Sequence, residues 1–221
     1  MNLTTRQAKA KQPNKKLQSP DESRRGLNIG VKMKEIIDKA KQILSEKNRI
    51  IIAIDGYCAS GKTTLAAHLT EVFDAQVIHM DDFFLTPDMR TEKRLLQAGG
   101  NVHYERFCHE VAAGLKSGET FTYNKFSCHT VDYSKSELIS PDRNIIVEGS
   151  YSMHPEIPDI YDLKIFLEAD YETQLGRILN RNGDDALEVF KSKWIPLENR
   201  YFEEFKIKEK CDITIKTDQK A

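Results

Sequence analysis

The stretch Gly56-Tyr57-Cys58-Ala59-Ser60-Gly61-Lys62-Thr63 fits the pattern G-x-x-x-x-G-K-[ST] of a phosphate-binding loop. The apolar, β-branched run 49–55 precedes it and predicts a buried strand. The run 64–69 follows it and favours a helix, with Leu65 and Leu69 four residues apart. A strand, a glycine loop and a helix start form an anion cradle, because free backbone N–H groups converge there with the positive end of the helix. The sequence therefore predicts a nucleoside triphosphate site.

Each residue type in this stretch has an expected role. The Lys62 ammonium would reach the β- and γ-phosphates of ATP, and the Thr63 hydroxyl would hold Mg²⁺. A plain glycine turn is the alternative, but such a turn needs neither side chain. The residues that we expect to bind the nucleotide are Gly56, Ala59, Ser60, Gly61, Lys62, Thr63 and Thr64.

Charge is distributed unevenly along the 221 residues, whose formal net charge is −1. Residues 1–30 carry seven Lys/Arg and two acidic residues, so this part is +5 and the remainder is −6. The acidic remainder argues against a nucleic-acid partner. The basic head has few apolar residues and predicts a disordered arm or leader over residues 1–30, with a weak nucleic-acid tether or a transit peptide as alternatives.

Composition also bears on the cellular setting. No window approaches the ~18 apolar residues of a membrane span, and no signal-peptide core is present. The four cysteines (58, 108, 128 and 211) include no C-x-x-C pair, which argues against a disulfide framework or a structural zinc site. We expect a cytoplasmic protein without a membrane partner. The oligomeric state stays open, a homo-oligomer included.

Hydrophobic patterning predicts a mostly parallel five-stranded sheet. Apolar runs at 76–80, 144–149, 164–169 and 212–216 join the strand before the loop, and helical spacing is found at 31–47 and 102–115. Strands that alternate with helices indicate an α/β three-layer sandwich, here a P-loop NTPase fold with a small lid. Ligands of such sheets collect beyond the carboxyl ends of the strands, where Gly56, Asp81 and Glu148 lie.

Carboxylates at these strand ends are the candidates for catalysis and metal binding. Glu148 ends an apolar strand, where an acidic group can hold Mg²⁺ directly or through water. Asp81 and Asp82 follow another strand, where a carboxylate can accept the proton of an attacking hydroxyl. Helix capping is the alternative for either Asp. We expect one of the two to catalyse.

Arg177 and Arg181 are four residues apart, so they share one face of a helix that ends at the turn signal 182–185. Arginines at such a hinge can fold over a transferring phosphate and neutralise its charge. A solvated helix face is the alternative. We expect these arginines to act with Asp81 and Lys62 in catalysis.

The chain resembles the uridine kinase/phosphoribulokinase group of P-loop kinases from about residue 49 to residue 216. The motifs that carry the resemblance are Ile54-Asp55-Gly56 through Thr64, Ile78-His79-Met80-Asp81-Asp82-Phe83-Phe84, Gly100-Asn101-Val102-His103-Tyr104-Glu105-Arg106-Phe107, Tyr123-Asn124-Lys125-Phe126 with His129, Val147-Glu148-Gly149 and Phe202-Glu203-Glu204-Phe205. The resemblance implies a kinase domain over 31–221 with a lid at about 177–200. It matches Asp81 to the catalytic base, Glu148 to the acidic metal-side residue, and Lys62 and Thr63 to the phosphate and Mg²⁺ ligands.

The resemblance also suggests where the acceptor binds. Tyr123, Phe126 and His129 fall where uridine kinases hold the pyrimidine, and Arg177 and Arg181 fall near the start of the lid. His103 stands where nucleoside kinases carry an Asp that grips the ribose hydroxyls. The substrate-binding candidates are thus Asp81, Asp82, His103, Tyr123, Phe126 and His129.

The leading hypothesis is an ATP- and Mg²⁺-dependent kinase acting on a hydroxyl of a small metabolite, with a nucleoside as the first acceptor to test. Other acceptors within the same chemistry are nicotinamide riboside, a sugar acid or pantothenate. A nucleotide-driven switch and a nucleic-acid-associated ATPase are the other classes. The run 124–127 offers only the first half of the N-K-x-D stretch that reads guanine, which argues against a GTP switch.

Overall fold

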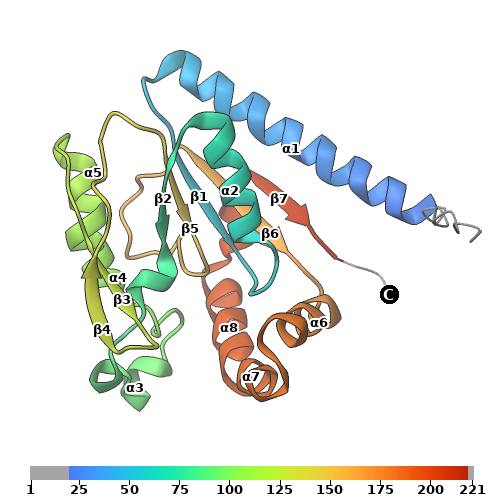
Figure 1. Ribbon diagram of the computed structural model, residues 1–221, viewed down its shortest axis with the longest axis vertical. Coiled ribbons are helices and arrows are strands. Elements are labelled where there is room, and N and C mark those ends of the chain that lie inside the picture. Colours follow the sequence, from blue (N-terminus) through green and yellow to red (C-terminus); the bar gives the residue numbers. More distant parts are fainter. Residues whose placement is uncertain (1–19, 219–221) are drawn as a thin grey trace, which may run out of the picture.

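The computed structural model describes residues 20–218, with side chains from residue 30 onward. The strands are β1 Ile51–Gly56, β2 Gln76–His79, β3 Asn124–Ser127, β4 Asp132–Lys135, β5 Ile145–Glu148, β6 Leu163–Glu168 and β7 Ile213–Lys216 (Figure 1). The α-helices are α1 Pro20–Glu46, α2 Lys62–Phe73, α3 Glu92–Leu95, α4 Tyr104–Phe107, α5 Ala113–Ser117, α6 Tyr171–Asn182, α7 Asp184–Val189 and α8 Ile195–Phe205. Short 3-10 turns cover Met80–Phe83, Pro87–Met89 and Ile207–Lys210, and π-helical turns cover Cys108–Ala112 and Phe190–Trp194.

Five strands form the main sheet in the order β2-β5-β1-β6-β7, and every neighbouring pair is parallel. All six residues of the central strand β1 are buried, as a strand covered on both faces requires. Its register pairs Ile54 with Glu148 of β5, so the end of the phosphate-loop strand lies beside the acidic strand end. The predicted five-stranded sheet is confirmed.

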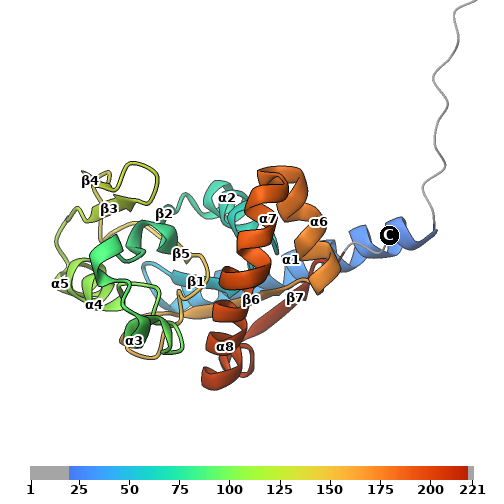
Figure 2. The same cartoon turned by 90° about the horizontal axis from the view of Figure 1, so that it is seen from below.

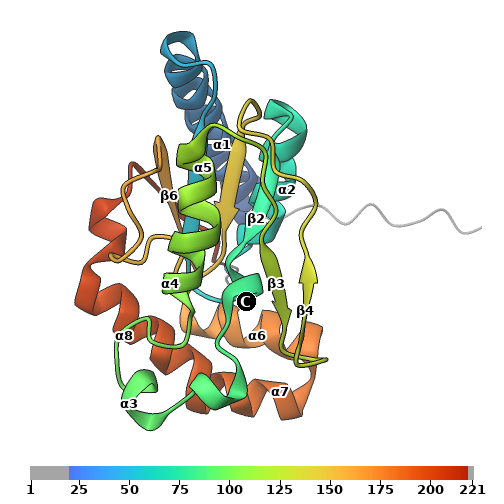
Figure 3. The ribbon, with the colours of Figure 1, turned by 90° about the vertical axis from the view of Figure 1, so that its left-hand side faces the viewer.

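Helices cover both faces of this sheet. On one face, α1 and α2 pack through Ile36, Leu65 and Leu69 against alternate residues of the strands. On the other face, the helical segment from α4 to α5 packs together with α8, through residues such as Val111 and Phe202. Figure 3 shows α4 and α5 on the opposite side of the sheet from α1 and α2. The predicted three-layer sandwich is confirmed.

Local details differ from the expectations. The helix expected over 31–47 begins at Pro20, where a proline followed by two acidic residues is a good helix start. Part of the segment assigned to a disordered arm is therefore helical, whereas residues 1–19 lie outside the described part. The polar segment after Pro87 contains the start of α3, where the Thr91 hydroxyl accepts a hydrogen bond from the Arg94 amide (3.2 Å).

The antiparallel pair β3–β4 was not expected either, because both strands are short and polar and β4 is exposed throughout. At the carboxyl end of the main sheet, α6 and α7 form a layer across the strand ends, followed by α8 (Figure 2). The segment predicted as a lid, residues 177–200, spans the end of α6, α7 and half of α8. None of the helices in the described part combines the length and apolar character that a membrane span needs.

Candidate active site

The phosphate loop leaves β1 at Gly56, a position that only glycine can occupy. Its φ is +137°, and a Cβ there would come within 2.1 Å of the Leu167 carbonyl oxygen. The Tyr57 amide donates to that carbonyl (3.2 Å), which fixes the start of the loop against β6. After Gly61, whose φ is +98°, α2 begins at Lys62, and its first-turn N–H groups have no helical acceptor. These N–H groups are available to an anion.

Lys62 is positioned by the loop that it serves. Its Nζ donates to the carbonyl oxygens of Gly56 (2.7 Å) and Tyr57 (2.8 Å) and to the Ser150 hydroxyl (3.2 Å). All three acceptors are neutral, and the side chain is buried at the cavity floor. None of these three acceptors forms an ion pair with Lys62, so its ammonium is available to a phosphate bound in the loop.

Thr63 and Glu148 form the candidate metal-side pair. The Thr63 hydroxyl lies 3.4 Å from both carboxylate oxygens of Glu148, which accepts a further hydrogen bond from His79 Nδ1 at 2.6 Å. This hydrogen bond raises the pKa of His79 above its ordinary value, against the opposing effect of desolvation. Hydroxyl and carboxylate oxygens suit Mg²⁺, which keeps waters and phosphate oxygens as its other ligands. The described residues contain no group of three or more His, Cys, Asp or Glu side chains arranged to hold a metal ion.

The adjacent carboxylates Asp81 and Asp82 have different surroundings. Asp81 lines the cavity, where desolvation of its carboxyl raises its pKa; the charge of Lys62 opposes the rise, and that of Glu148 adds to it. Asp82 points elsewhere, and its Oδ2 accepts the Tyr123 hydroxyl hydrogen bond at 2.9 Å. A carboxylate with a raised pKa that faces the phosphate loop can accept a proton, so Asp81 is the better candidate for the base.

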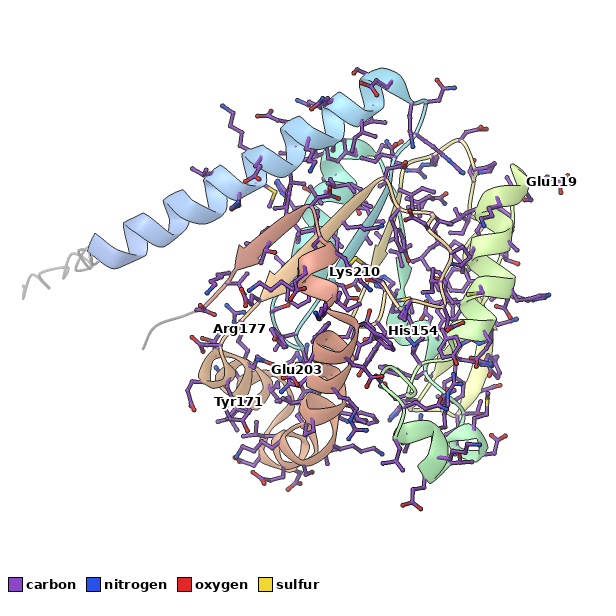
Figure 4. The ribbon with its side chains drawn as sticks, turned by 180° about the vertical axis from the view of Figure 1, so that it is seen from behind. Glu119, His154, Tyr171, Arg177, Glu203 and Lys210 are labelled. Carbon is purple, nitrogen blue, oxygen red and sulfur yellow. The ribbon has the colours of Figure 1, made fainter. Side chains whose placement is uncertain are left out.

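The two lid arginines line the cavity but differ in their partners. Arg177 Nη1 donates to the Ala59 carbonyl (2.9 Å) and to the Thr217 hydroxyl (3.1 Å), and Nη2 donates to the Thr217 carbonyl. Arg177 thus ties the phosphate loop to the segment after β7, as its position near the end of that strand indicates (Figure 4). Arg181 donates only to the side chain of its neighbour Asn182 (2.7 Å) among the described residues. Arg181 is the freer of the two to contact a phosphate.

One cavity of about 1100 Å³ joins these groups along the carboxyl edge of the sheet. Lys62 and Thr63 line it beyond the central strand β1. Asp81, which follows the edge strand β2, lines the cavity on that side. Thr217, which follows the opposite edge strand β7, lines it on the other side. With Asp81 as the candidate base, the β2 side is the candidate acceptor end of the cavity and the β7 side is the candidate donor end. The cavity is large enough for both substrates.

Five residues expected to bind substrate are not brought to the wall of this cavity: Asp82, His103, Tyr123, Phe126 and His129. Tyr123 is buried, stacks on Phe83 with centroids 5.3 Å apart and uses its hydroxyl on Asp82. Phe126 is buried against Tyr133 of β4, and His129 is exposed in the turn between β3 and β4. His103 immediately precedes α4 and is half-buried.

Two buried acids that support the site were missed by sequence reasoning. Asp55 is fully buried and accepts four hydrogen bonds, from the amides of Gly56, Tyr151 and Met153 and from the Tyr201 hydroxyl. Burial raises its pKa, and these hydrogen bonds oppose the rise. An acid that directly follows the apolar run 50–54, inside the predicted strand, was the available sequence signal.

Glu198 of α8 is the second buried acid. Its Oε2 accepts the Cys58 amide of the phosphate loop, and its Oε1 accepts the Ser150 hydroxyl, each at 2.8 Å. Burial raises its pKa, and the charge of Lys62 opposes the rise. The carboxylate joins α8 to the loop. Trp194 lies four residues before Glu198 and also lines the cavity. Residues four apart share one helix face, and this spacing was the sequence signal for Glu198.

The phosphate loop, the Thr63–Glu148 pair and the free carboxylate of Asp81 define a P-loop phosphotransferase site. The model of the phosphoribulokinase / uridine kinase family matches residues 51–186, more than half of the chain. The chain belongs to this family and is a small-molecule kinase. The resemblance inferred from the sequence is confirmed.

Individual relatives are distant. Uridine kinase of Chlamydia pneumoniae is 26% identical over 168 residues, which cover 71% of this chain and 75% of the relative. Nicotinamide riboside kinase of Saccharomyces cerevisiae is 26% identical over 186 residues, which cover 73% and 76%. Among solved structures, a possible uridine kinase from Bacillus stearothermophilus is 23% identical, with a TM-score of 0.59 over 82% of this chain and 99% of that chain. This structural likeness shows the shared fold.

Proposed function

We propose that the chain transfers the γ-phosphoryl group of ATP, with Mg²⁺, to a hydroxyl group of a small metabolite. The observation that carries this proposal is the free carboxylate of Asp81, which faces the same cavity as Lys62 and Thr63. A carboxylate in that place serves a reaction that needs an alcohol activated beside the phosphate loop.

Each side chain has a separate role in the proposed reaction. Asp81 orients the acceptor hydroxyl and takes its proton as the oxygen bonds to the γ-phosphorus and the bond from phosphorus to the ADP oxygen breaks. Lys62 and the first-turn N–H groups of α2 hold the phosphates, and Arg181 balances the charge that develops on them. Thr63 and Glu148 would hold Mg²⁺, which neutralises charge on the β- and γ-phosphate oxygens.

Two acceptor classes compete within this chemistry. The names of the relatives, a uridine kinase and a nicotinamide riboside kinase, favour a nucleoside. The side chains expected to hold the pyrimidine and the ribose do not line the cavity, and this favours a different alcohol. The acceptor end instead presents Phe84, Arg90, Leu95, Asn101, Cys128 and Trp194.

The test is ADP release from Mg-ATP across nucleosides, sugar acids and pantothenate, with controls that lack the acceptor or Mg²⁺. Turnover that depends on one acceptor and on Mg²⁺ supports the proposal. Turnover without any acceptor favours an ATPase instead. Tight GTP binding without acceptor-dependent turnover favours a nucleotide switch.

The remaining expectations follow from the proposed reaction. We expect a small-molecule acceptor rather than a nucleic acid as the partner, and a cytoplasmic location, where ATP is available. Light scattering of the purified chain would show whether it is a homo-oligomer.

A further inference from the structure

Arg90 is a cation at the acceptor end whose guanidinium has no acidic partner in the described part of the chain. Its Nε donates to the Leu85 carbonyl at 2.9 Å, and its Nη2 donates to Cys128 Sγ at 3.3 Å. No carboxylate oxygen of residues 30–218 lies within 4.0 Å of the Arg90 guanidinium nitrogens, which is the distance limit for a salt bridge. These two contacts fix the direction of the guanidinium, and neither of them comes from a carboxylate.

The two neighbouring arginines have a different environment. Arg94 forms a bidentate pair with Glu105, at 2.7 and 2.8 Å, and its guanidinium lies 4.3 Å from the centre of the Tyr104 ring. Arg106 has Glu110 at 3.7 Å. Both cations are compensated within the fold, so their role is structural. Arg90 differs from them because it lines the cavity and keeps its charge uncompensated.

The acids that line the cavity are already engaged elsewhere. Glu148 serves Thr63 and His79, and Glu198 accepts from the phosphate-loop amide and from a serine hydroxyl. Asp81 carries the proposed base function at the side of the phosphate loop. No acid that lines the cavity pairs with Arg90, so its positive charge is available to an anionic ligand.

We propose that the acceptor is an acidic alcohol, whose carboxylate or phosphate group pairs with Arg90 while its hydroxyl lies against Asp81. A guanidinium held by its Nε presents its remaining N–H groups to an oxyanion in the geometry that carboxylates and phosphates match. Phe84 and Trp194, with ring centroids 6.4 Å apart, cover the part of the acceptor between its two polar ends. This inference rests on the proposed kinase function and selects the acceptor within it.

The reaction leaves the acidic group unchanged. The hydroxyl oxygen forms the new bond to the γ-phosphorus, the bond to ADP breaks and the hydroxyl proton passes to Asp81. Arg90 holds the acceptor in place throughout, so its contribution is expected mainly in KM for the acceptor.

Matched acceptor pairs test the proposal. We would measure ADP release with glycerate and glycerol, pantothenate and pantothenol, and ribose 5-phosphate and ribose, together with uridine. We expect turnover with an acid and at least tenfold lower kcat/KM with its neutral counterpart. The carboxylate and phosphate pairs separate the two sources of the oxyanion.

Variants of Arg90 assign the preference to this residue. Arg90→Gln should lower kcat/KM for the preferred acid by about 10- to 100-fold, chiefly through KM, because a charge-assisted hydrogen bond is lost. KM for ATP should stay unchanged, which also reports an intact fold. Arg90→Lys should recover part of the loss, because lysine restores the positive charge but not the paired N–H donors of a guanidinium. Lys93→Gln removes one positive charge from exposed α3 and should behave as the parent chain.

Three outcomes contradict the proposal, and they are distinguishable. Turnover with uridine or another neutral alcohol at or above the level of every acid would leave the kinase function in place and overturn the acidic acceptor. An equal loss with acidic and neutral acceptors in Arg90→Gln would assign Arg90 to the phosphates of ATP. Absence of acceptor-dependent ADP release from every chain would overturn the proposed function, and the inference with it.

Discussion

Asp81 and Asp82 are neighbours in the chain, yet the structure gives them different surroundings. Asp82 is held by the Tyr123 hydroxyl, a residue 41 positions away, whereas Asp81 faces the cavity. The strand-end pattern predicted that one of the pair would be the base, and the family resemblance indicated Asp81; the different partners of the two side chains are known only from the structure. The distinction arises from the 3-10 turn Met80–Phe83, in which successive side chains point in different directions.

Replacing Asp81 by Asn is the most direct test at this scale. Asp81→Asn keeps the shape of the side chain but removes the proton acceptor, so phosphoryl transfer should fall by about 10²-fold or more. ATP affinity, measured by titration calorimetry, should change little, because Lys62 and the loop amides are untouched. Unchanged turnover would exclude Asp81 from the mechanism. Asp82→Asn is the comparison. It should lower turnover less than Asp81→Asn does, because Asp82 does not line the cavity.

The helices show where local pattern sufficed and where it did not. The helical spacing of 102–115 predicted the segment from α4 to α5, which ends at Gly118 in the left-handed conformation as expected for a helix stop. The spacing of 31–47 also predicted a helix, although α1 begins eleven residues earlier. Apolar spacing marks the packed half of a helix, and the half beyond the sheet carries no such signal.

Packing of α1 gives a prediction at the scale of the element. Ile36 is fully buried between α1 and the sheet, whereas Val31 on the same helix is 59% exposed. Ile36→Ala should lower the free energy of unfolding by about 3 kcal/mol, through lost burial and the cavity left behind. Val31→Ala should change it by less than about 0.5 kcal/mol. Urea unfolding measures both, and equal effects would contradict the packing of α1 described here.

Two residues on separate helices connect the segment predicted as a lid to the phosphate loop. Arg177 of α6 donates to the Ala59 carbonyl, and Glu198 of α8 accepts from the Cys58 amide. Both contacts involve backbone groups of the loop, so a shift of either helix would move the phosphate site. The arginine pair was predicted from its i, i+4 spacing, but its division into a structural Arg177 and a freer Arg181 depends on Thr217, forty residues away.

At the scale of the whole molecule, an aromatic cluster joins the segment after β5 to helices on the second face of the sheet. His154, which is labelled in Figure 4, stacks on Tyr104 with ring centroids 4.2 Å apart. Its ring centroid lies 6.1 Å from that of Tyr201 and 5.7 Å from that of Phe205. Its Nδ1 accepts the Glu156 amide at 3.2 Å, so the ring proton lies on Nε2. Burial lowers the pKa of His154 to about 4, and the ring is neutral at pH 7.

This pKa makes the stability of the fold depend on pH. His154 has its ordinary pKa of about 6.5 in the unfolded chain, so acid favours unfolding. Its contribution is complete above about pH 6.5 and is lost as the pH falls toward 4, by at most about 3 kcal/mol. In His154→Gln, the unfolding free energy should depend less steeply on pH between 6.5 and 4.5. The decrease in slope should correspond to at most one proton bound on unfolding. Exposed His109→Gln should keep the parent slope. Identical slopes in all three chains would contradict a buried neutral His154.

The sequence by itself determined the phosphate loop, the five strands of the parallel sheet and the edge at which the ligands collect. These features follow from local signals, because hydrophobic period and glycine spacing act within a few residues. Tertiary structure alone decided which carboxylate faces the cavity and which arginine lacks a counter-ion. Tyr123 lies 41 residues from Asp82, Ala59 lies 118 residues from Arg177, and Cys128 lies 38 residues from Arg90. A side chain is left free for substrate only when the folded chain brings no partner to it, and no local pattern records that condition.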